Sequence, residues 1–427
     1  MNDIFIAGYS NRRYLYCRIC SIPAITLHLI DGSWRREDLL NPKDFENSRA
    51  GSCVKTLQGY WAFIPNPLPP QIEYDQELIR SLSEADRLVG ELAGTGRLLP
   101  NPYLLIGPYV RREAVSSSRI EGTQASLSDL FFFEAAETEE PDVPDVREVR
   151  NYVRAMEHGL ERLKELPVSI RLIREIHQIL MEDVRGGHAT PGEIRRSQNW
   201  IGPPGCSLND ATFVPPPVEE MHRCLSDWEK YLHAEPGEPP LVKCAFMHYQ
   251  FEAIHPFLDG NGRIGRLLIT FFLCERGYLT QPLLYLSAFI EQFRDEYYER
   301  LLAVSQKGDW RGWIDFFLRG IARAAQDAIS DGRKILEIHA EYQAALRATK
   351  KIPEAAYRLV EEVFLNPVVS MSSFSQKFGI PFNSVKTGIL RLIDVGILEE
   401  MPGRKRNRLF IARKLMDFLT KRRVDFR

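Results

Sequence analysis

Long apolar runs are missing from this sequence of 427 residues. No run reaches the roughly 18–20 apolar residues that a membrane-spanning helix needs. Residues 21–30 are apolar and follow Arg12, Arg13 and Arg18, which faintly suggests a signal peptide, but polar residues interrupt them and no small-residue cleavage site follows. We therefore expect a cytoplasmic protein with no membrane partner.

Cysteine is sparse and shows no pattern, since the seven cysteines are scattered and odd in number. Cys17 and Cys20 form a C-x-x-C pair, but no second pair or histidine cluster follows at zinc spacing. Cys224, Cys244 and Cys274 lie in apolar helical contexts, where cysteine usually acts as a small core residue. This usage argues against a zinc site and fits a reducing compartment.

An excess of one charge is also lacking, because the formal net charge is only -2. A nearly neutral chain is not a polyanion binder as a whole. The balance is uneven, however, since residues 134–148 are rich in acidic side chains and residues 404–427 in basic ones. This asymmetry is a clue to partners of the basic end.

Strand alternation is rare, and most of the chain from residue 51 to 349 shows the three-and-four spacing of amphipathic helices. Residues 1–50 show no clear period, and we expect a poorly defined extension there. A short hairpin is expected around residues 211–214, kept at an edge by the three prolines that follow it. The pattern predicts an all-α fold. The predicted helices span residues 78–92, 109–120, 146–165, 169–181, 218–233, 240–254, 262–276 and 291–306.

The character of the sequence changes in residues 350–427. Helices are predicted at residues 354–364, 372–378 and 381–395, with Ser372 as a possible N-cap of the second. Two short strands are predicted at residues 397–400 and 408–411. Three helices and a two-stranded wing make a winged helix-turn-helix, so we expect a small α+β domain here.

Two adjoining segments carry the residues with chemistry. A helix should end near Ile254, because the residue before a proline avoids helical geometry and His255 precedes Pro256. A new helix should begin at Gly260-Asn261-Gly262, whose backbone N–H groups are free to bind an anion. The sequence therefore predicts a phosphate site where these two segments meet.

Charged side chains complete this site. Arg263 and Arg266 lie three apart, so both can face one phosphate, and guanidinium groups are suited to phosphate oxygens. Asp259 would repel a bare phosphate but fits a Mg²⁺ ion between the two. His255 can accept a proton from an attacking hydroxyl. Taken singly, these residues have simpler explanations as a cap, a turn and a solvated face, but they are contiguous.

The segment from His255 to Arg266 resembles the motif of the Fic family without a departure: His-Pro-Phe, two residues of which the second is acidic, Gly-Asn-Gly-Arg, two residues and Arg. The resemblance extends over residues 54–349. It implies an all-α Fic core at residues 141–349, after an N-terminal helical region at residues 51–140. It also implies transfer of AMP from Mg-ATP to a Ser, Thr or Tyr hydroxyl of a target protein.

The resemblance implies a role for each motif residue. His255 would be the general base, and Asp259 would hold Mg²⁺. A flap near residues 209–215 would cover the substrate strand. The implied phosphate contacts come from Gly260, Asn261 and Gly262 for the α- and β-phosphates, from Arg263, and from Arg266 for the γ-phosphate.

A second segment, residues 117–122, resembles the inhibitory motif of the same family. Ser117 and Glu121 are four apart and share a helix face. A capped helix end at Gly122 would also explain the segment. The resemblance instead implies that Glu121 pairs with Arg266 and inhibits the enzyme from an N-terminal helix.

Outside these motifs, several residues have competing explanations. His248 lies on an apolar helix face and is expected in the core. Tyr297 and Tyr298 are candidate acceptors for self-modification, although helix packing is the simpler interpretation. Lys377, Lys386, Arg391, Arg404, Lys405, Arg406 and Arg408 could bind DNA from the C-terminal domain.

Three alternatives stay open at this point. The C-terminal domain could serve protein docking or a homodimer and not DNA. The whole chain could be a transcription regulator that senses a nucleotide, although a sensor needs neither the base His255 nor the metal ligand Asp259. The same site could also remove AMP from a modified protein, with Glu121 positioning water.

Overall fold

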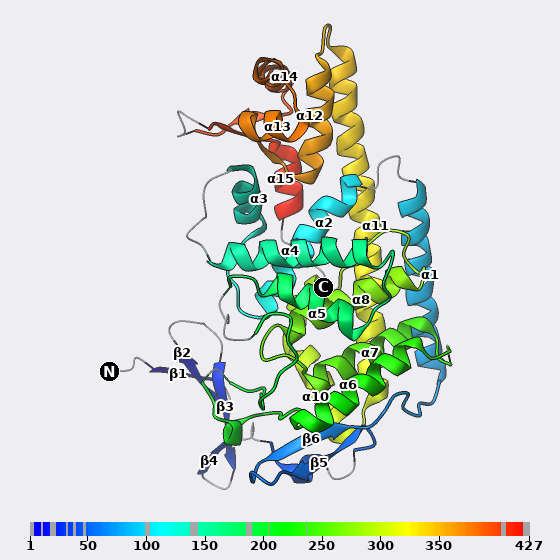
Figure 1. The fold of residues 1–427 in the computed structure, drawn as a ribbon. Coiled ribbons are helices and arrows are strands. Elements are labelled where there is room, and N and C mark those ends of the chain that lie inside the picture. The colour runs from blue at the N-terminus through cyan, green and yellow to red at the C-terminus, as the bar shows by residue number, and fades with distance from the viewer. Residues whose placement is uncertain are drawn as a thin grey trace.

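The structure is a computed structural model that describes most of the chain (Figure 1). Before residue 40 it describes the backbone of four strands. Helices dominate the rest and confirm the predicted all-α core, and within the described stretches no helix is long and apolar enough to cross a bilayer. These stretches are residues 40–45, 48–98, 103–136, 144–184, 190–203, 205–235, 237–402 and 407–421.

An antiparallel sheet stands near the N-terminus, where we expected no regular element. Its strands pair in sequence order. The alternation of Ile25, Leu27 and Leu29 with Thr26 and His28 is the signal that the expectation overlooked. The strands are β1 (Ile4–Tyr9), β2 (Arg12–Cys17), β3 (Pro23–Ile30) and β4 (Ser33–Arg36).

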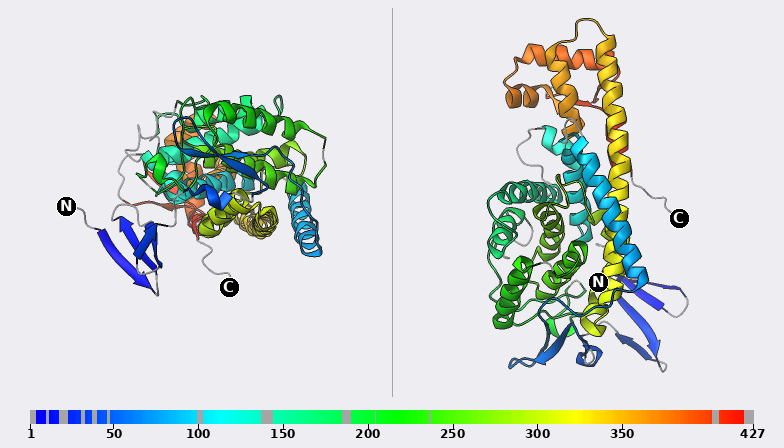
Figure 2. Two further views of the ribbon diagram at one scale, coloured as in Figure 1. Left: turned by 90° about the horizontal axis from the view of Figure 1, so that it is seen from below. Right: turned by 90° about the vertical axis from the view of Figure 1, so that its right-hand side faces the viewer.

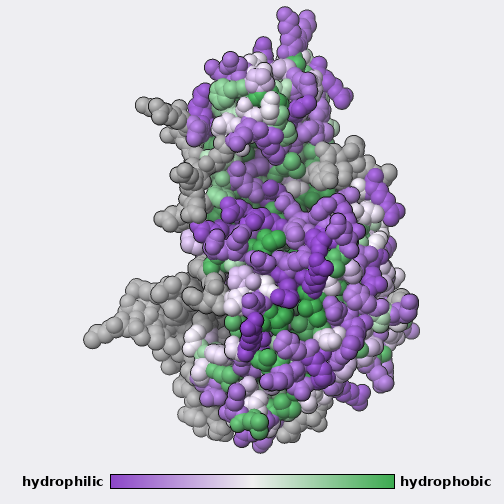
Figure 3. All heavy atoms as spheres, viewed as in Figure 1, coloured by the Kyte–Doolittle hydropathy of each residue, from purple (hydrophilic) through white to green (hydrophobic). Residues whose placement is uncertain are grey.

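Two consecutive helices, α7 (Pro240–Ile254) and α8 (Asn261–Glu275), form the centre of the core. Nearly every residue of α7 is buried, because neighbouring helices cover it on all sides. His248 is fully buried, as expected, and bonds through its ring nitrogens to Gly265 O at 3.0 Å and Tyr297 OH at 2.9 Å. With its apolar side chains inside, the molecule presents a largely hydrophilic face around smaller hydrophobic patches (Figure 3).

A pair of long helices, α1 (Gln76–Leu98) and α11 (Trp310–Ala348), runs side by side along the molecule (Figure 2). The predicted apolar face of α1 is buried at Leu78 and Leu88, whereas Ile79 is 52% exposed. No prediction was made for α11. Its 39 residues connect the core to the C-terminal part of the chain.

The other predicted helices are present, but α1 ends six residues after its predicted end, and the helix expected from residue 109 begins at Tyr103, six residues earlier. The periodicity predicted the bounds of α6 (Val218–His233) and α7 as the structure has them. The helix expected at residues 291–306 is divided at Phe293, whose φ is -112° and ψ is 40°. The remaining core helices are α2 (Tyr103–Ile120), α3 (Leu127–Ala136), α4 (Pro144–Arg162), α5 (Ile170–Leu180), α9 (Ser287–Gln292) and α10 (Arg294–Lys307).

The hairpin expected at residues 211–214 is reduced to a single bridge between Ile201 and Phe213. A different hairpin, β5 (Gly51–Lys55) with β6 (Trp61–Pro65), lies beside it. The N–H of Phe63 donates to Val214 O at 2.8 Å, so β6, and not a second strand of the expected hairpin, is the neighbour of residue 214. The proposed flap is thus tied to the N-terminal part of the chain.

Residues 350–421, which we call the C-terminal module, form helices and a small sheet at one end of the molecule (Figure 1). Ser370 caps α13 by accepting the N–H of Ser373 at 3.0 Å, so the assignment of Ser372 was wrong. The sheet has three strands in the order β7-β9-β8, one more than predicted. Arg404, Lys405 and Arg406 lie outside the described residues. The elements are α12 (Glu354–Leu365), β7 (Val368–Ser370), α13 (Met371–Phe378), α14 (Phe382–Asp394), β8 (Glu399–Glu400), β9 (Leu409–Ile411) and α15 (Arg413–Thr420).

Candidate active site

The turn between α7 and α8 brings the two predicted segments together. His255 ends α7 in the left-handed region, with φ 51° and ψ 61°. Gly260 precedes α8 with φ 80°, a conformation that costs glycine little. The helix end at Ile254 is therefore confirmed, and α8 begins at Asn261. Its first N–H groups have no intrahelical partner and point toward the turn.

Asn261 fixes the shape of this turn. Its side-chain oxygen accepts the N–H of Phe257 at 2.9 Å, and its amide nitrogen donates to Phe257 O at 2.8 Å. The side chain is buried and fully engaged with the turn. The expected phosphate contact of Asn261 stays a prediction for its backbone N–H.

Arg195 and Asn199 hold the turn from outside, and neither was predicted from the sequence. Arg195 is fully buried and donates to His255 O at 2.9 Å and to Ser197 O at 3.2 Å. Asn199 donates to His255 O at 3.1 Å and to Phe257 O at 2.7 Å. Burial lowers the pKa of Arg195 to about 10, so the side chain remains a cation at neutral pH. Buried carbonyls thus replace a carboxylate as its partners.

His177 supports the other end of the turn. Its Nδ1 accepts the N–H of Gly192 at 2.8 Å, so its Nε2 carries the proton and donates to Asp259 O at 3.1 Å. The ring stacks on Phe257 with centroids 3.8 Å apart. Burial lowers the pKa of His177 to about 4, which keeps this neutral tautomer at physiological pH.

His255, the expected general base, is partly buried at the same turn. Burial lowers its pKa to about 4, so the imidazole is neutral at pH 7 and can accept a proton. Its Nδ1 lies 3.2 Å from Glu252 O, a carbonyl that can only accept. Nδ1 therefore carries the hydrogen, and the lone pair is on Nε2.

Asp259 and Arg263 are neighbours across the first turn of α8. Asp259 is half-exposed and accepts the N–H of Gly260 at 2.6 Å, and its Oδ1 lies 3.8 Å from Arg263 Nη2. Arg263 is buried near Glu148 and Met181, yet its Nε and Nη1 lack hydrogen-bond partners in the described chain. Such unused donors are suited to a phosphate.

A metal at Asp259 would depend on the substrate for its other ligands. No group of three or more His, Cys, Asp or Glu side chains that could hold an ion occurs among the described residues. Mg²⁺ is commonly bound by one carboxylate together with substrate phosphates and water. The exposed Asp259, beside free phosphate donors, fits that arrangement.

Arg266 meets both residues of the expected inhibitory motif. Its Nε donates to Ser117 Oγ at 2.8 Å, and its Nη2 donates to Ser117 O at 2.9 Å and to Glu121 Oε1 at 2.7 Å. Burial alone would raise the pKa of Glu121, but Arg266 outweighs it and lowers that pKa. The predicted pair is thus a charged contact between α2 and α8.

The Glu121 carboxylate also covers the start of α8. A Cβ added at Gly262 would collide with Glu121 Oε1 and would lie 2.9 Å from Arg266 Nη1. Only glycine lets the carboxylate approach the backbone so closely. The carboxylate therefore lies against the first turn of α8, beside the guanidinium of Arg266.

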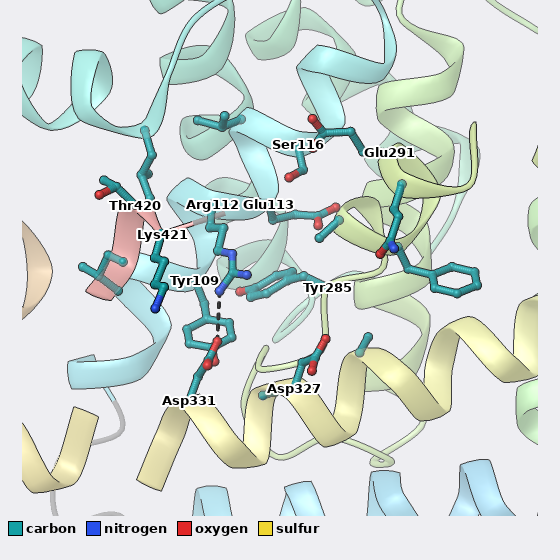
Figure 4. A pocket seen from close by; sticks show the side chains of 18 of the residues that line it. Tyr109, Arg112, Glu113, Ser116, Tyr285, Glu291, Asp327, Asp331, Thr420 and Lys421 are labelled. Atoms are coloured by element: carbon teal, nitrogen blue, oxygen red, sulfur yellow. Dashed lines mark hydrogen bonds and ion pairs between the residues drawn. The ribbon is translucent and has the colours of Figure 1, made fainter. Parts of the chain in front are cut away.

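The opposite side of α2 borders a cavity of about 660 Å³ with both polar and apolar lining residues (Figure 4). Arg112 of α2 reaches across it to Asp331 of α11 at 2.9 Å. Arg119 lies 3.7 Å from Glu291, in α9. Ser117 lies on α2 and Glu121 in the turn directly after it, not on the helix as expected, so ionic contacts hold this segment on both sides.

Comparison with known proteins identifies the region around this site. Residues 79–161 match the Fic/DOC family N-terminal domain, and residues 167–273 match the Fic/DOC family domain. The protein adenylyltransferases Fic of Drosophila persimilis and Drosophila melanogaster are 31% and 30% identical to this chain over 159 residues. That region is 36% of this chain, and it covers 27% and 28% of the two relatives.

One solved structure extends the likeness beyond this region. A Fic family protein from Desulfovibrio desulfuricans G20 aligns with a TM-score of 0.53 and 19% identity. The alignment covers 81% of this chain and 98% of that one. The two chains share the fold.

Proposed function

We propose, on the premise that the chain carries a Fic/DOC domain homologous to Fic adenylyltransferases, that it transfers AMP from Mg-ATP to a hydroxyl of a target protein. The observation that carries the proposal is the start of α8. A neutral histidine ends the preceding helix, and Arg263 in the first turn of α8 has two nitrogens without hydrogen bonds to the described residues. A base beside a phosphate site is what nucleotidyl transfer requires.

In this reaction, His255 Nε2 takes the proton of the acceptor hydroxyl. The hydroxyl oxygen attacks the α-phosphorus of ATP, and the bond from that phosphorus to the bridging oxygen breaks. Pyrophosphate leaves, and AMP stays on the target as a phosphodiester. Arg263 and the N–H groups of Gly260, Asn261 and Gly262 bind the phosphates, and Arg266 binds the γ-phosphate. Mg²⁺ held by Asp259 would neutralise part of the phosphate charge.

Glu121 and Ser117 keep this site inhibited in the proposed function. Glu121 accepts a hydrogen bond from the Arg266 guanidinium that the γ-phosphate needs, with Glu121 Oε1 2.7 Å from Arg266 Nη2. A triphosphate then binds with its γ-phosphate displaced, which misaligns the α-phosphate for attack. Misplacement of about 1 Å can cost roughly 10²-fold in rate. The helix α2, which ends directly before Glu121, is thus proposed as an N-terminal inhibitory helix.

The acceptor remains open for self-modification, but one of the candidates is not available. Tyr297 is buried and bonded to His248, whereas Tyr298 is 39% exposed. The C-terminal module is proposed as a winged helix-turn-helix on the basis of its three helices and small sheet. Binding of DNA, docking of a protein and a homodimer all stay possible roles for it.

The test uses the full chain, a cell lysate, labelled ATP and Mg²⁺, followed by mass spectrometry. We expect a 5′-AMP adduct on a Ser, Thr or Tyr of a target. His255→Ala should reduce the rate about 10²–10⁴-fold, because a general base contributes about that much. ATP binding should persist, since the imidazole makes no phosphate contact in the proposal. Transfer by His255→Ala at the wild-type rate would show that the base is wrongly assigned.

If the chain only senses nucleotide, ATP binds and no adduct forms. If it removes AMP instead, an AMP-modified target loses its adduct in the presence of the wild-type chain. Adding purified AMP-modified protein to the same assay separates these outcomes. Either result would replace the proposed forward reaction.

A further inference from the structure

Glu252 is a carboxyl group that the proposed reaction does not use. It lies in the last turn of α7, three residues before His255. Its Oε1 is buried and has no hydrogen-bond partner among the described residues. A buried carboxyl oxygen left without a partner costs free energy, so its presence at a ligand site calls for an explanation.

The position of Glu252 mirrors that of Glu121. Gly262 and Gly265 lie three apart on α8, and a Cβ added at either would collide with a carboxyl group. Glu121 covers Gly262, and Glu252 covers Gly265. Residues three apart share a helix face, so the two carboxyl groups approach the same side of α8. Arg266 is next to both, but only Glu121 is hydrogen-bonded to it.

Arg266 brings one positive charge to this place, and Glu121 already balances it. Among the described residues, the charged groups that act on Glu252 are Arg266 and Glu121. Tyr297 from α10 and the neutral rings of His248 and His255 lie near it. Burial raises the pKa of Glu252 to about 8; Arg266 opposes that rise, and Glu121 adds to it. At neutral pH, Glu252 is therefore an uncharged acid beside a charged pair.

We propose that Glu252 is a second partner of Arg266 whose role depends on its protonation. When its carboxyl is uncharged, Arg266 is left to pair with Glu121 or with the γ-phosphate of ATP. When the carboxyl is ionised, Glu252 pairs with the guanidinium of Arg266 and weakens ATP binding. The inference rests on the proposed function, because it assigns Arg266 to the γ-phosphate. Two carboxyl groups would then compete with one phosphate for a single cation.

The electrostatics give the direction of two effects. A carboxylate at Glu252 cancels the charge of Arg266, so a triphosphate is attracted less as pH rises through the ionisation of Glu252. Glu121 raises the pKa of Glu252, so removing Glu121 moves that ionisation to lower pH. Bound ATP, which is itself negative, favours the uncharged acid. ATP binding above this ionisation must therefore take up a proton.

The experiment measures ATP binding by calorimetry from pH 7.5 to pH 9.5, where terminal phosphates are already ionised because their pKa is near 6. Four full-length proteins are compared: wild type, Glu121→Gly, Glu252→Gln and the double variant. We expect ATP affinity to fall with pH in wild type and in Glu121→Gly, by at most about tenfold per pH unit. The fall should begin at lower pH in Glu121→Gly. Both Glu252→Gln proteins should show a flat profile.

A second readout uses the unmutated chain. At pH 8.5, ATP binding in two buffers of different ionisation enthalpy should show uptake of a proton, and Glu252→Gln should show none. AMP, which lacks the γ-phosphate, should bind without this uptake. Glutamine has the shape of the neutral acid, so a purely structural role predicts no difference in proton uptake.

Equal pH dependence in the Glu252→Gln proteins and their parents would overturn this inference and leave AMP transfer standing. If the Glu252→Gln proteins give a flat pH profile and lose proton uptake, but the wild-type chain transfers no AMP, the role of Glu252 is supported and the proposed reaction is rejected. Absence of ATP binding at every pH would reject both.

Discussion

The Fic/DOC domain buries two arginines at its candidate active site, whereas Arg391 and Lys377 of the C-terminal module form ion pairs at the surface. Arg195 and Arg266 are almost fully buried in the domain, and each makes three or more hydrogen bonds with fixed partners. In the module, Arg391 and Lys377 are exposed and pair with single carboxylates, Asp394 at 3.3 Å and Glu362 at 2.6 Å. A buried cation is held in one place, whereas an exposed one is free to exchange its partner for another anion.

This difference explains why the two regions carry proposals of different kinds. In the domain, a ligand must displace a specific internal partner, such as Glu121 at Arg266. In the module, a polyanion has only to compete with weak surface pairs. The comparison is sharpened by substitutions that remove charges from each region.

Removing Asp259 is expected to have the largest effect. Its side chain is half-exposed and supports little of the fold, so Asp259→Ala should change the free energy of unfolding by less than about 0.5 kcal/mol. Transfer in Mg²⁺ should fall at least about 10²-fold, since a metal typically supplies several kcal/mol of charge stabilisation. Transfer rates and denaturation midpoints are measured on the same preparations. Full activity of the variant, or of wild type in a chelator, would remove the metal from the account.

A matched pair of arginines tests burial directly. Arg195→Met should lower the free energy of unfolding by about 3 kcal/mol, because the carbonyls of His255, Ser197 and Pro216 lose a charged donor. Arg391→Met should lower it by less than about 0.5 kcal/mol, as for other exposed pairs. Urea denaturation of both variants gives the two values. If both variants lose a similar free energy of unfolding, burial of the arginine does not determine how much it contributes to stability.

DNA binding by the module is expected to be the weakest effect. Lys386 is exposed on α14 and has no ion pair within the described part of the chain, whereas Arg408 is 3.0 Å from Glu400. The full chain should retard duplex DNA at low salt and release it as salt rises, because phosphate contacts release counterions. Lys386→Gln should reduce the salt slope by about 1. If no salt concentration gives retardation, docking or dimerisation becomes the better account of the module.

The sequence was informative where chemistry is contiguous. His255, Asp259, Arg263 and Arg266 fall within twelve residues, so their spacing alone placed them at one helix start. Glu121 was placed by a resemblance, because its partner Arg266 is 145 residues away.

Supporting residues were missed for the same reason. Arg195 acts on His255 across 60 residues, and His177 acts on Asp259 across 82. Neither residue stands in a local sequence pattern, because the role of each comes from hydrogen bonds to backbone carbonyls that are distant in the sequence. Helical periodicity succeeded for α6 and α7. The sheet of β1 to β4 was missed although β3 shows alternation, because a single short alternating run is a weak signal without its neighbouring strands.

The central claim is that Glu121 occupies the position of a phosphate on Arg266. Self-modification or target modification with labelled ATP should be compared for wild type, Glu121→Gly and the double variant Glu121→Gly with Arg266→Ala. We predict a gain of roughly 10²-fold for Glu121→Gly, because the α-phosphate recovers its alignment, and loss of that gain in the double variant. A Glu121→Gly protein no faster than wild type, with matching thermal stability, would contradict the account.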